Sequence, residues 1–223
     1  MAEGARALAV HERLLEFYGQ PDWPTPQGPI EELVSTILSQ NTNDINRDKA
    51  FAALTARYPN WEAVRDADPE EVVDTIRVAG LANQKGPRIQ AVLRDISEQR
   101  GELSLDFLRE LDREEAREWL QSFKGVGPKT AAIVLQYGLG VPAFAVDTHI
   151  HRITGRIGLR SPKLTADKTH DLLEALLPPE TWYAAHLNII RLGREVCQAR
   201  VPKCPDCPLQ DLCDYYAEVY QGE

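Results

Sequence analysis

The chain has 223 residues, enough to bury a substantial core in one domain or in two small ones. It contains no apolar run that approaches the length of a membrane span, no low-complexity tract and no repeat period, so membrane-spanning and repeat architectures are excluded. Its formal net charge of −9 argues against a uniformly basic surface.

The charges are unevenly spread along the chain. Acidic residues gather in the stretches 62–74 and 110–118. We therefore expect an acidic back and a basic face, the latter built from Lys85, Arg88, Arg94, Arg191, Arg194, Arg200 and Lys203.

Helical periodicity runs through nearly the whole chain. The first helix is predicted to end at Gly19, before a proline-rich connector over residues 21–29. Apolar residues recur at spacings of three and four over 30–38, 44–54, 69–76, 89–96, 150–157 and 172–177. Start signals are Asp44 and Asp68 as N-caps and Asp112 with Glu115 as a capping box. Apart from a short extended piece at 143–146, alternating strand patterns are missing, which predicts an all-α fold.

The segment 120–149 carries a glycine turn directly before a helix. Gly125 and Gly127 can adopt backbone angles closed to other residues, and Pro128 suits the first helical position. The amides from Gly125 through Val126 to Lys129 then point outward at the positive end of a helix dipole, which forms a phosphate site. By itself, the turn is equally compatible with an ordinary helical hairpin and a surface lysine.

Asp147 precedes the next helical run. Aspartate is a good N-cap, and the same helix terminus keeps its carboxylate ionised. A capping role and a role as a catalytic anion are therefore compatible.

The four cysteines, Cys197, Cys204, Cys207 and Cys213, lie in one short segment. Four thiolates from one segment hold either a 4Fe–4S cluster or a tetrahedral zinc ion, and spacing alone does not choose between them. Because the N-terminal segment reads as a charged amphipathic helix and not as a secretory signal, we do not expect disulfides.

The GVGPKTA motif followed by VDTH resembles the helix-hairpin-helix/Gly-Pro-Asp superfamily of DNA glycosylases. A lysine inside the hairpin, together with the C-x6-C-x2-C-x5-C spacing, is similar to the endonuclease III family, which consists of bifunctional DNA glycosylases and abasic-site lyases with a 4Fe–4S cluster. The resemblance extends over residues 28–213. It implies a six-helix domain over 22–136 that contains the hairpin, and a cluster domain formed by 1–21 and 137–223, with a DNA cleft between them.

The resemblance also implies roles for individual residues. Lys129 would attack the sugar as a neutral amine, Asp147 would stabilise positive charge on it, and the strand would be cut by β-elimination at oxidised pyrimidines and abasic sites in duplex DNA. Gln40 would fill the gap left by the extruded nucleotide, and Leu81 would act as a wedge. The DNA-contacting set is Gln40, Leu81, Gly125, Val126, Gly127, Lys129, His149, Arg200 and Lys203.

Two features depart from the family pattern. Ala82 stands where many members carry tyrosine after the wedge leucine, and the net charge is acidic where many members are basic. Three other interpretations therefore stay open: a monofunctional glycosylase that uses Asp147 and water, a weakly active DNA-binding member, and a zinc-binding helical module. No heptad seam is present, so we expect a monomer, acting in the cytoplasm in association with the nucleoid.

Overall fold

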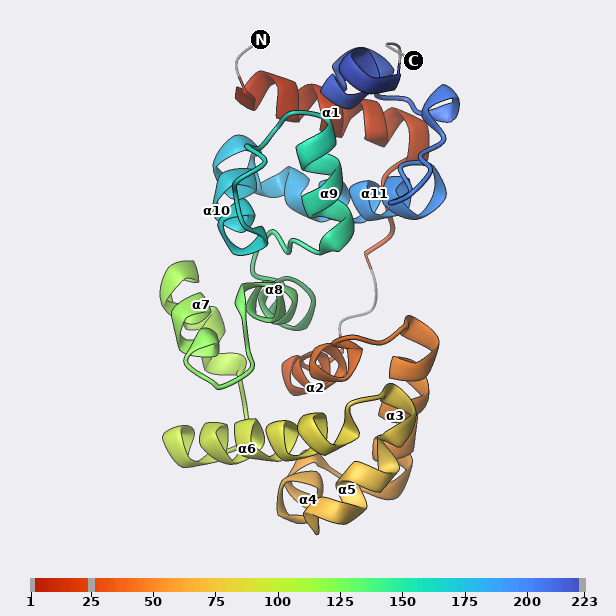
Figure 1. Cartoon of the computed structure of the whole chain (residues 1–223). Coiled ribbons are helices and arrows are strands. Elements are labelled where there is room, and N and C mark those ends of the chain that lie inside the picture. Colours follow the sequence, from red (N-terminus) through yellow and green to blue (C-terminus); the bar gives the residue numbers. More distant parts are fainter. Residues whose placement is uncertain (1–2, 24–26, 221–223) are drawn as a thin grey trace. The chain divides into compact units, whose positions relative to one another are not determined.

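The computed structural model describes residues 3–23 and 27–220, and every regular element in this part of the chain is a helix (Figure 1). The all-α prediction is therefore confirmed. The chain divides into two compact units, residues 25–141 and residues 1–24 with 142–223. We call these the middle unit and the terminal unit. No described helix is long and apolar enough to cross a membrane.

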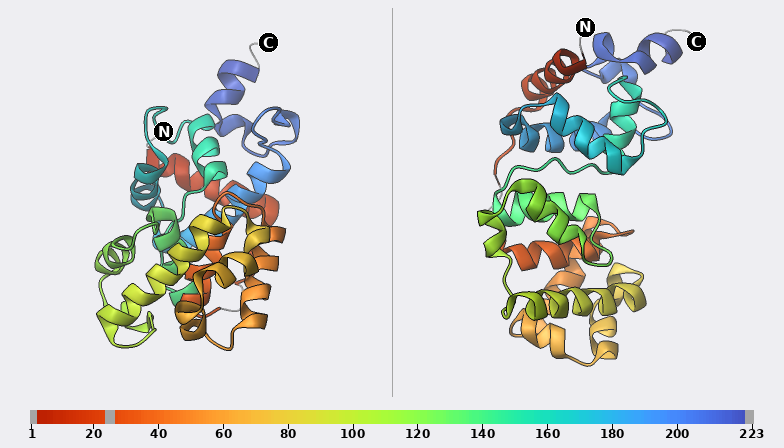
Figure 2. Two further views of the ribbon diagram at one scale, coloured as in Figure 1. Left: turned by 60° about the horizontal axis from the view of Figure 1, so that its bottom comes forward. Right: turned by 90° about the vertical axis from the view of Figure 1, so that its left-hand side faces the viewer.

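The middle unit consists of helices joined by short turns. Its elements are α2 (Pro29–Ser39), α3 (Asp44–Arg57), α4 (Trp61–Asp66), α5 (Pro69–Thr75), the 3₁₀ turn η1 (Arg77–Ala79), α6 (Ala82–Arg100), η2 (Asp106–Glu110), α7 (Arg113–Gln121), α8 (Pro128–Ile133) and the π-helical turn η3 (Val134–Leu139). Helix α6 packs against both α4 and α5, as Figure 2 shows from two sides. Gly138 of η3 lies so close to α2 that a Cβ there would come within 2.8 Å of the Pro29 Cα.

Most of the predicted helix starts are present. The side chain of Asp68 accepts a hydrogen bond from the amide of Glu70, and Asp112 with Glu115 forms the expected capping box. Asp44 was the wrong cap for α3. The side chain of Asn43 caps this helix instead, by accepting a bond from the amide of Asn46, and Asp44 is its first residue. Two adjacent residues are good caps here, and short-range pattern does not rank them.

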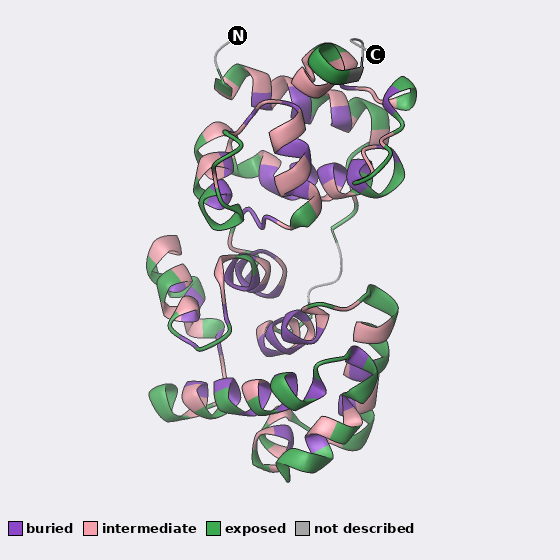
Figure 3. Cartoon of the chain, viewed as in Figure 1, coloured by how far each residue is buried: buried purple, intermediate pink, exposed green. Residues whose placement is uncertain are grey.

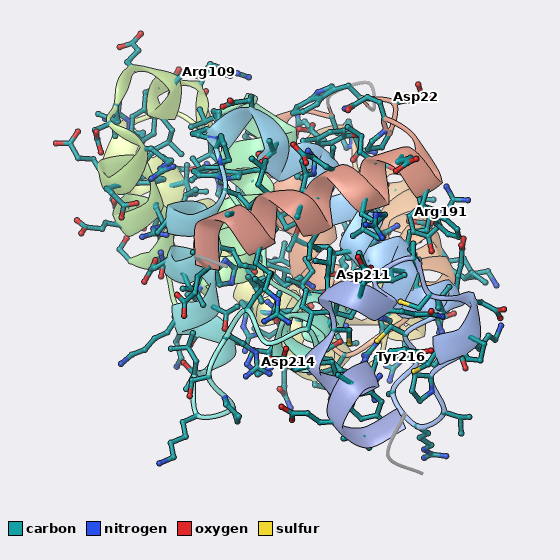
Figure 4. The ribbon with its side chains drawn as sticks, turned by 90° about the horizontal axis from the view of Figure 1, so that it is seen from above. Asp22, Arg109, Arg191, Asp211, Asp214 and Tyr216 are labelled. Atoms are coloured by element: carbon teal, nitrogen blue, oxygen red, sulfur yellow. The ribbon has the colours of Figure 1, made fainter. Side chains whose placement is uncertain are left out.

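The terminal unit packs α1 (Glu3–Tyr18), α9 (Thr148–Arg156), α10 (Ala166–Leu176) and α11 (Trp182–Glu195), with the short turns η4 (Pro179–Thr181), η5 (Cys204–Asp206), η6 (Gln210–Leu212) and η7 (Tyr216–Tyr220). Its core is a single apolar cluster on the facing sides of these helices (Figure 3). Two ion pairs tie the C-terminal segment to α1: Arg6 with Asp214, and Arg13 with Asp211 at 3.0 Å (Figure 4). Both carboxylates are exposed enough that each pair adds little stability by itself.

Candidate functional site

The glycine turn connects α7 to α8 in the middle unit. Helix α7 ends at Gln121, and the chain then turns back to begin α8 at Pro128. Val126 is buried and its amide donates to the carbonyl of Phe123 at 3.1 Å, so the turn is anchored from inside. Gly125 is exposed and has a φ of +91°, a conformation that a Cβ disfavours. The first amides of α8 have no acceptor within the helix and can receive an anion.

Lys129 lies in the first turn of α8, two residues after Gly127. The residue is exposed, and within the described residues its ammonium has no hydrogen bond or ion pair. Next to it, Thr130, Ala131 and Ala132 are buried and hold the helix against the middle unit. The structure therefore presents an uncommitted amine beside an anion-binding turn, on a rigid helix start.

Asp147 is the N-cap of α9 in the terminal unit. One carboxylate oxygen, Oδ1, accepts a hydrogen bond from the amide of Ile150 at 2.8 Å. The residue is half-buried, and no other side-chain bond to it is present among the described residues. The carboxylate is therefore fixed in direction by the helix start, with its second oxygen available to another group.

Gln40 immediately follows the end of α2, where it is the C-cap residue. Its amide is not free: Arg88 Nη1 donates to Gln40 Oε1 at 2.7 Å, and Gln40 Nε2 donates to the carbonyl of Gly125 at 3.3 Å. The glutamine therefore touches the hairpin turn, which lies 85 residues further along the chain. Arg88 was predicted only as part of a basic face, and its role as the partner of Gln40 depends on this long-range contact.

Leu81 stands between η1 and α6 and is 47% exposed, so it is not an ordinary buried loop leucine. It adopts the left-handed conformation with a φ of 50°. The only other non-glycine residue with positive φ in the described chain is Asn41, directly after Gln40 (φ 54°). The loops that hold Gln40 and Leu81 therefore each contain a non-glycine residue in the left-handed region, a conformation that asparagine adopts readily and that costs backbone energy for leucine.

The four cysteines line a single cavity in the terminal unit, together with apolar side chains of α9 and α11 such as Ile153 and Leu192. None is in a disulfide. The pKa of Cys207 is raised to about 11, mainly by burial; a backbone hydrogen bond at Leu209 lowers it, and the charges of the other three cysteines raise it. Within the part of the chain described, no three His, Cys, Asp or Glu side chains converge closely enough to hold a single metal ion.

Arginines of α9 hold the loop between Cys197 and Cys204. Arg156 donates from Nη1 to Cys197 Sγ at 3.3 Å and to the Gln198 carbonyl at 2.7 Å, and from Nη2 to the Ala199 carbonyl at 2.8 Å. Arg152 donates from Nη2 to the carbonyl of Cys197 at 2.8 Å. Sequence reasoning missed both arginines, because only the fold brings α9 beside this loop.

The loop itself exposes the two cations that the sequence proposed for DNA contact. Arg200 and Lys203 are both exposed, whereas the Lys203 amide is fixed by the carbonyl of Val196 at 2.9 Å. His149 is turned toward its own unit: its Nδ1 lies 3.1 Å from Arg152 Nη2 and close to Gly193 of α11. This geometry favours packing for His149.

The predicted basic face needs one correction. Lys85 is only 1% exposed, so its charge does not reach any surface. Arg191 is exposed but is paired with Glu195 at 3.0 Å. The remaining basic contribution in the middle unit comes from Arg88 and Arg94, both on α6.

Comparisons with known proteins show which family the chain is similar to. Residues 34–179 match the family model of the HhH-GPD superfamily of base excision DNA repair proteins. The chain is 36% identical to endonuclease III of Thermotoga maritima over 195 residues, 87% of each chain, and 33% identical to endonuclease III of Escherichia coli K12 over 217 residues, 96% of this chain and 98% of the relative. A solved non-covalent endonuclease III–DNA complex superposes with a TM-score of 0.84 at 27% identity, covering 99% of this chain and 100% of that one. A trapped covalent endonuclease III–DNA intermediate superposes with 0.83 at 28% identity, covering 98% and 99%.

Proposed function

Because the chain belongs to the HhH-GPD superfamily of base excision DNA repair proteins, and within it to the endonuclease III family, we propose that it removes oxidised pyrimidines from duplex DNA and cuts the strand at the abasic site. The chain is a DNA glycosylase and lyase of base excision repair that binds DNA. The lesion class, the residues that act and the order of steps are our proposal. The observation that carries it is the exposed, unpartnered ammonium of Lys129 beside the glycine turn.

The reaction begins with nucleophilic attack. After losing a proton to solvent, Lys129 Nζ attacks C1′ of the damaged nucleotide; the glycosidic bond breaks, and its electrons leave with the base, which takes up a proton from solvent. Asp147 stabilises the positive charge that develops on the sugar as this bond lengthens. Its capping bond keeps the carboxylate fixed, so no reorganisation is needed during the reaction.

Strand cutting follows from the covalent amine. When the attached Lys129 nitrogen loses a proton, its lone pair forms the C1′=N bond of an iminium as the C1′–O4′ bond breaks and O4′ takes up a proton. The iminium acidifies the hydrogens on C2′. Removal of one of these protons expels the 3′ phosphate by β-elimination, and hydrolysis returns the free lysine. The backbone amides of Gly125, Gly127 and Lys129 hold a nearby phosphate, while Gln40 and Leu81 occupy the gap left by the extruded nucleotide.

We further propose that the four cysteines hold a 4Fe–4S cluster. The spacing of the four cysteines is compatible with a tetrahedral zinc as well as with a cluster, and the choice of a 4Fe–4S cluster rests on membership of the endonuclease III family. The four cysteines that line the apolar-walled cavity, of which Cys204 is buried and the other three are half-buried, would supply the thiolate ligands of the cluster. When bound, it would crosslink the segment 197–213 and so hold Arg200 and Lys203 for contact with the DNA backbone. We propose a monomer that acts on the chromosome, in the cytoplasm and associated with the nucleoid.

Borohydride trapping on a duplex with one abasic site tests the proposal. Wild type is expected to give a covalent protein–DNA band that Lys129→Ala abolishes. Lys124→Ala is the matched control, because Lys124 is an exposed lysine of the same turn. No band in iron-loaded wild type, with base release retained, would replace the lyase mechanism by attack of water. A protein purified without oxygen that contained zinc and no iron would contradict the cluster.

A further inference from the structure

Lys85 is buried in the middle unit without a carboxylate partner. It is 1% exposed, and within the described residues no acidic group lies within ion-pair distance. Burial lowers the pKa of its ammonium, as expected where the charged form is desolvated. The residue also lies in the first turn of α6, at the end of the helix dipole that disfavours a cation. Neither its burial nor its own helix explains why lysine occupies this position.

The ammonium of Lys85 joins two loops. Its Nζ donates to the carbonyl of Leu38 at 2.8 Å and to the carbonyl of Ala79, also at 2.8 Å. Leu38 stands two residues before Gln40, and Ala79 stands two residues before Leu81. One side chain therefore hydrogen-bonds to the backbone two residues before each of the two residues proposed to enter the DNA.

The bond to Leu38 completes the end of α2. Each of the last four carbonyls of this helix accepts a hydrogen bond. Ser39 Oγ donates to the carbonyl of residue 36 at 2.7 Å, and the Gln40 amide donates to that of residue 37 at 3.3 Å. Lys85 Nζ donates to the carbonyl of residue 38, and the Thr42 amide donates to that of residue 39 at 3.3 Å. Because α2 has no basic residue in its own last turn, Lys85 supplies the cation that this end of a helix favours.

The bond to Ala79 stabilises the other strained loop. Gly80 has a φ of 67° and Leu81 a φ of 50°, directly before α6 begins. The Lys85 amide donates to the Leu81 carbonyl at 2.9 Å, so backbone and side chain of one residue both hold this turn. Gly86 is seated against Val73 of α5, where a Cβ would come within 2.9 Å of Val73 Cγ2, and this contact fixes the start of α6.

We propose that Lys85 is a positioning residue that sets the spacing of Gln40 and Leu81, so that the two side chains enter a duplex together. This proposal rests on the proposed function of those two residues. With a fixed spacing, either side chain contributes fully only when the other is also inserted. Removing both should then weaken binding by less than the product of the single losses.

A double-mutant cycle tests this coupling. The dissociation constant for a duplex with a tetrahydrofuran abasic analogue is measured for wild type, Gln40→Ala, Leu81→Ala and the double variant, and again with Lys85→Met added to each. In the wild-type background we expect the loss of affinity in the double variant to be about tenfold smaller than the product of the two single-variant losses. In the Lys85→Met background we expect it to equal that product within about twofold. Lys49→Met, an exposed lysine of the same unit, should leave the coupling unchanged.

Two outcomes overturn the proposal. One is a double loss equal to the product in the wild-type background, a result that requires no Lys85 variant to fold. The other is unchanged coupling in Lys85→Met. General destabilisation by the substitution, monitored by thermal denaturation, would lower all affinities in parallel and leave the coupling in place. Because the analogue undergoes no chemistry, failure of Lys129 trapping would contradict the proposed reaction without affecting this result.

Discussion

The guanidinium of Arg88 donates a hydrogen bond to Oε1 of Gln40 across 2.7 Å. The other end of the same glutamine amide is bound to the carbonyl of Gly125. Arg88 on α6 thereby orients Gln40 at the end of α2 and anchors it to the hairpin turn. Preorganisation of this kind improves binding by reducing the conformational freedom lost on association.

Replacing Arg88 with methionine should therefore weaken recognition of damaged DNA. We expect a loss of about three- to tenfold in affinity for an abasic-analogue duplex, the range of one net hydrogen bond, with a smaller loss for intact duplex. Fluorescence anisotropy with both duplexes measures this. Equal losses on the two duplexes would show that Arg88 only contacts phosphate.

The glycine turn offers a matched pair of substitutions. In Gly125→Ala the new Cβ would collide with Arg88 Nε, at a φ of +91° that alanine disfavours, so we expect a loss of about 1–2 kcal/mol in the free energy of unfolding. Gly127→Ala meets nothing within 4 Å and has a φ of −95°, and should change stability by well under that amount. Denaturant unfolding of both variants measures the difference, and equal effects would contradict the turn geometry.

Substitutions at Asp147 can separate its structural and chemical roles. Asparagine caps helices as well as aspartate, so Asp147→Asn should keep the bond to the Ile150 amide and retain stability while losing the charge. We expect single-turnover base release to fall by about 10²-fold or more. Asp147→Ala should show the same kinetic loss and, in addition, lose about 1 kcal/mol of stability with the cap. If Asp147→Asn released the base at the wild-type rate, the charge of Asp147 would have no role in the reaction and the residue would act only as a helix cap.

Arg156 should control the loop that carries Arg200 and Lys203. Methionine at position 156 removes three donors to Cys197 Sγ and to the carbonyls of Gln198 and Ala199. We expect faster amide hydrogen exchange over residues 197–203 and weaker DNA binding at unchanged iron content. Lysine should rescue only in part, because one ammonium cannot reproduce the planar fork of arginine. Unchanged exchange in Arg156→Met would mean that the cysteines alone order the loop.

His11 predicts a pH dependence of stability. Burial lowers the pKa of this side chain below its usual value of 6.5, and the nearby Glu12 opposes the shift only partly. As pH falls below about 6.5 the unfolded chain binds this proton before the folded chain does, so the contribution of His11 to stability is lost in acid. Urea unfolding at pH 7.5 and 5.5 should show a smaller drop for His11→Gln than for wild type. Equal drops would assign the acid sensitivity to other groups.

Part of this structure follows from short-range pattern. The caps at Asp68, Asp112 and Asp147 and the turn before Pro128 depend on residues within about four positions, and the helix geometry that uses them is local. The error at Asp44 is of the same kind, since Asn43 is an equally good cap one residue earlier. The all-α class and the family follow from such signals together with the motif spacing.

By itself, the sequence determined which elements form and which chemical groups the chain supplies: the hairpin with Lys129, the capping carboxylate of Asp147 and the four thiols. Only the tertiary structure decided where several charged side chains lie. Lys85, expected on a basic surface, is buried and donates a hydrogen bond to the carbonyl of Leu38, 47 residues away in sequence. Gln40 donates to the carbonyl of Gly125, 85 residues away. These contacts arise from the packing of α2 against α6 and α8, which juxtaposes residues far apart in the chain and leaves no periodic trace in the sequence.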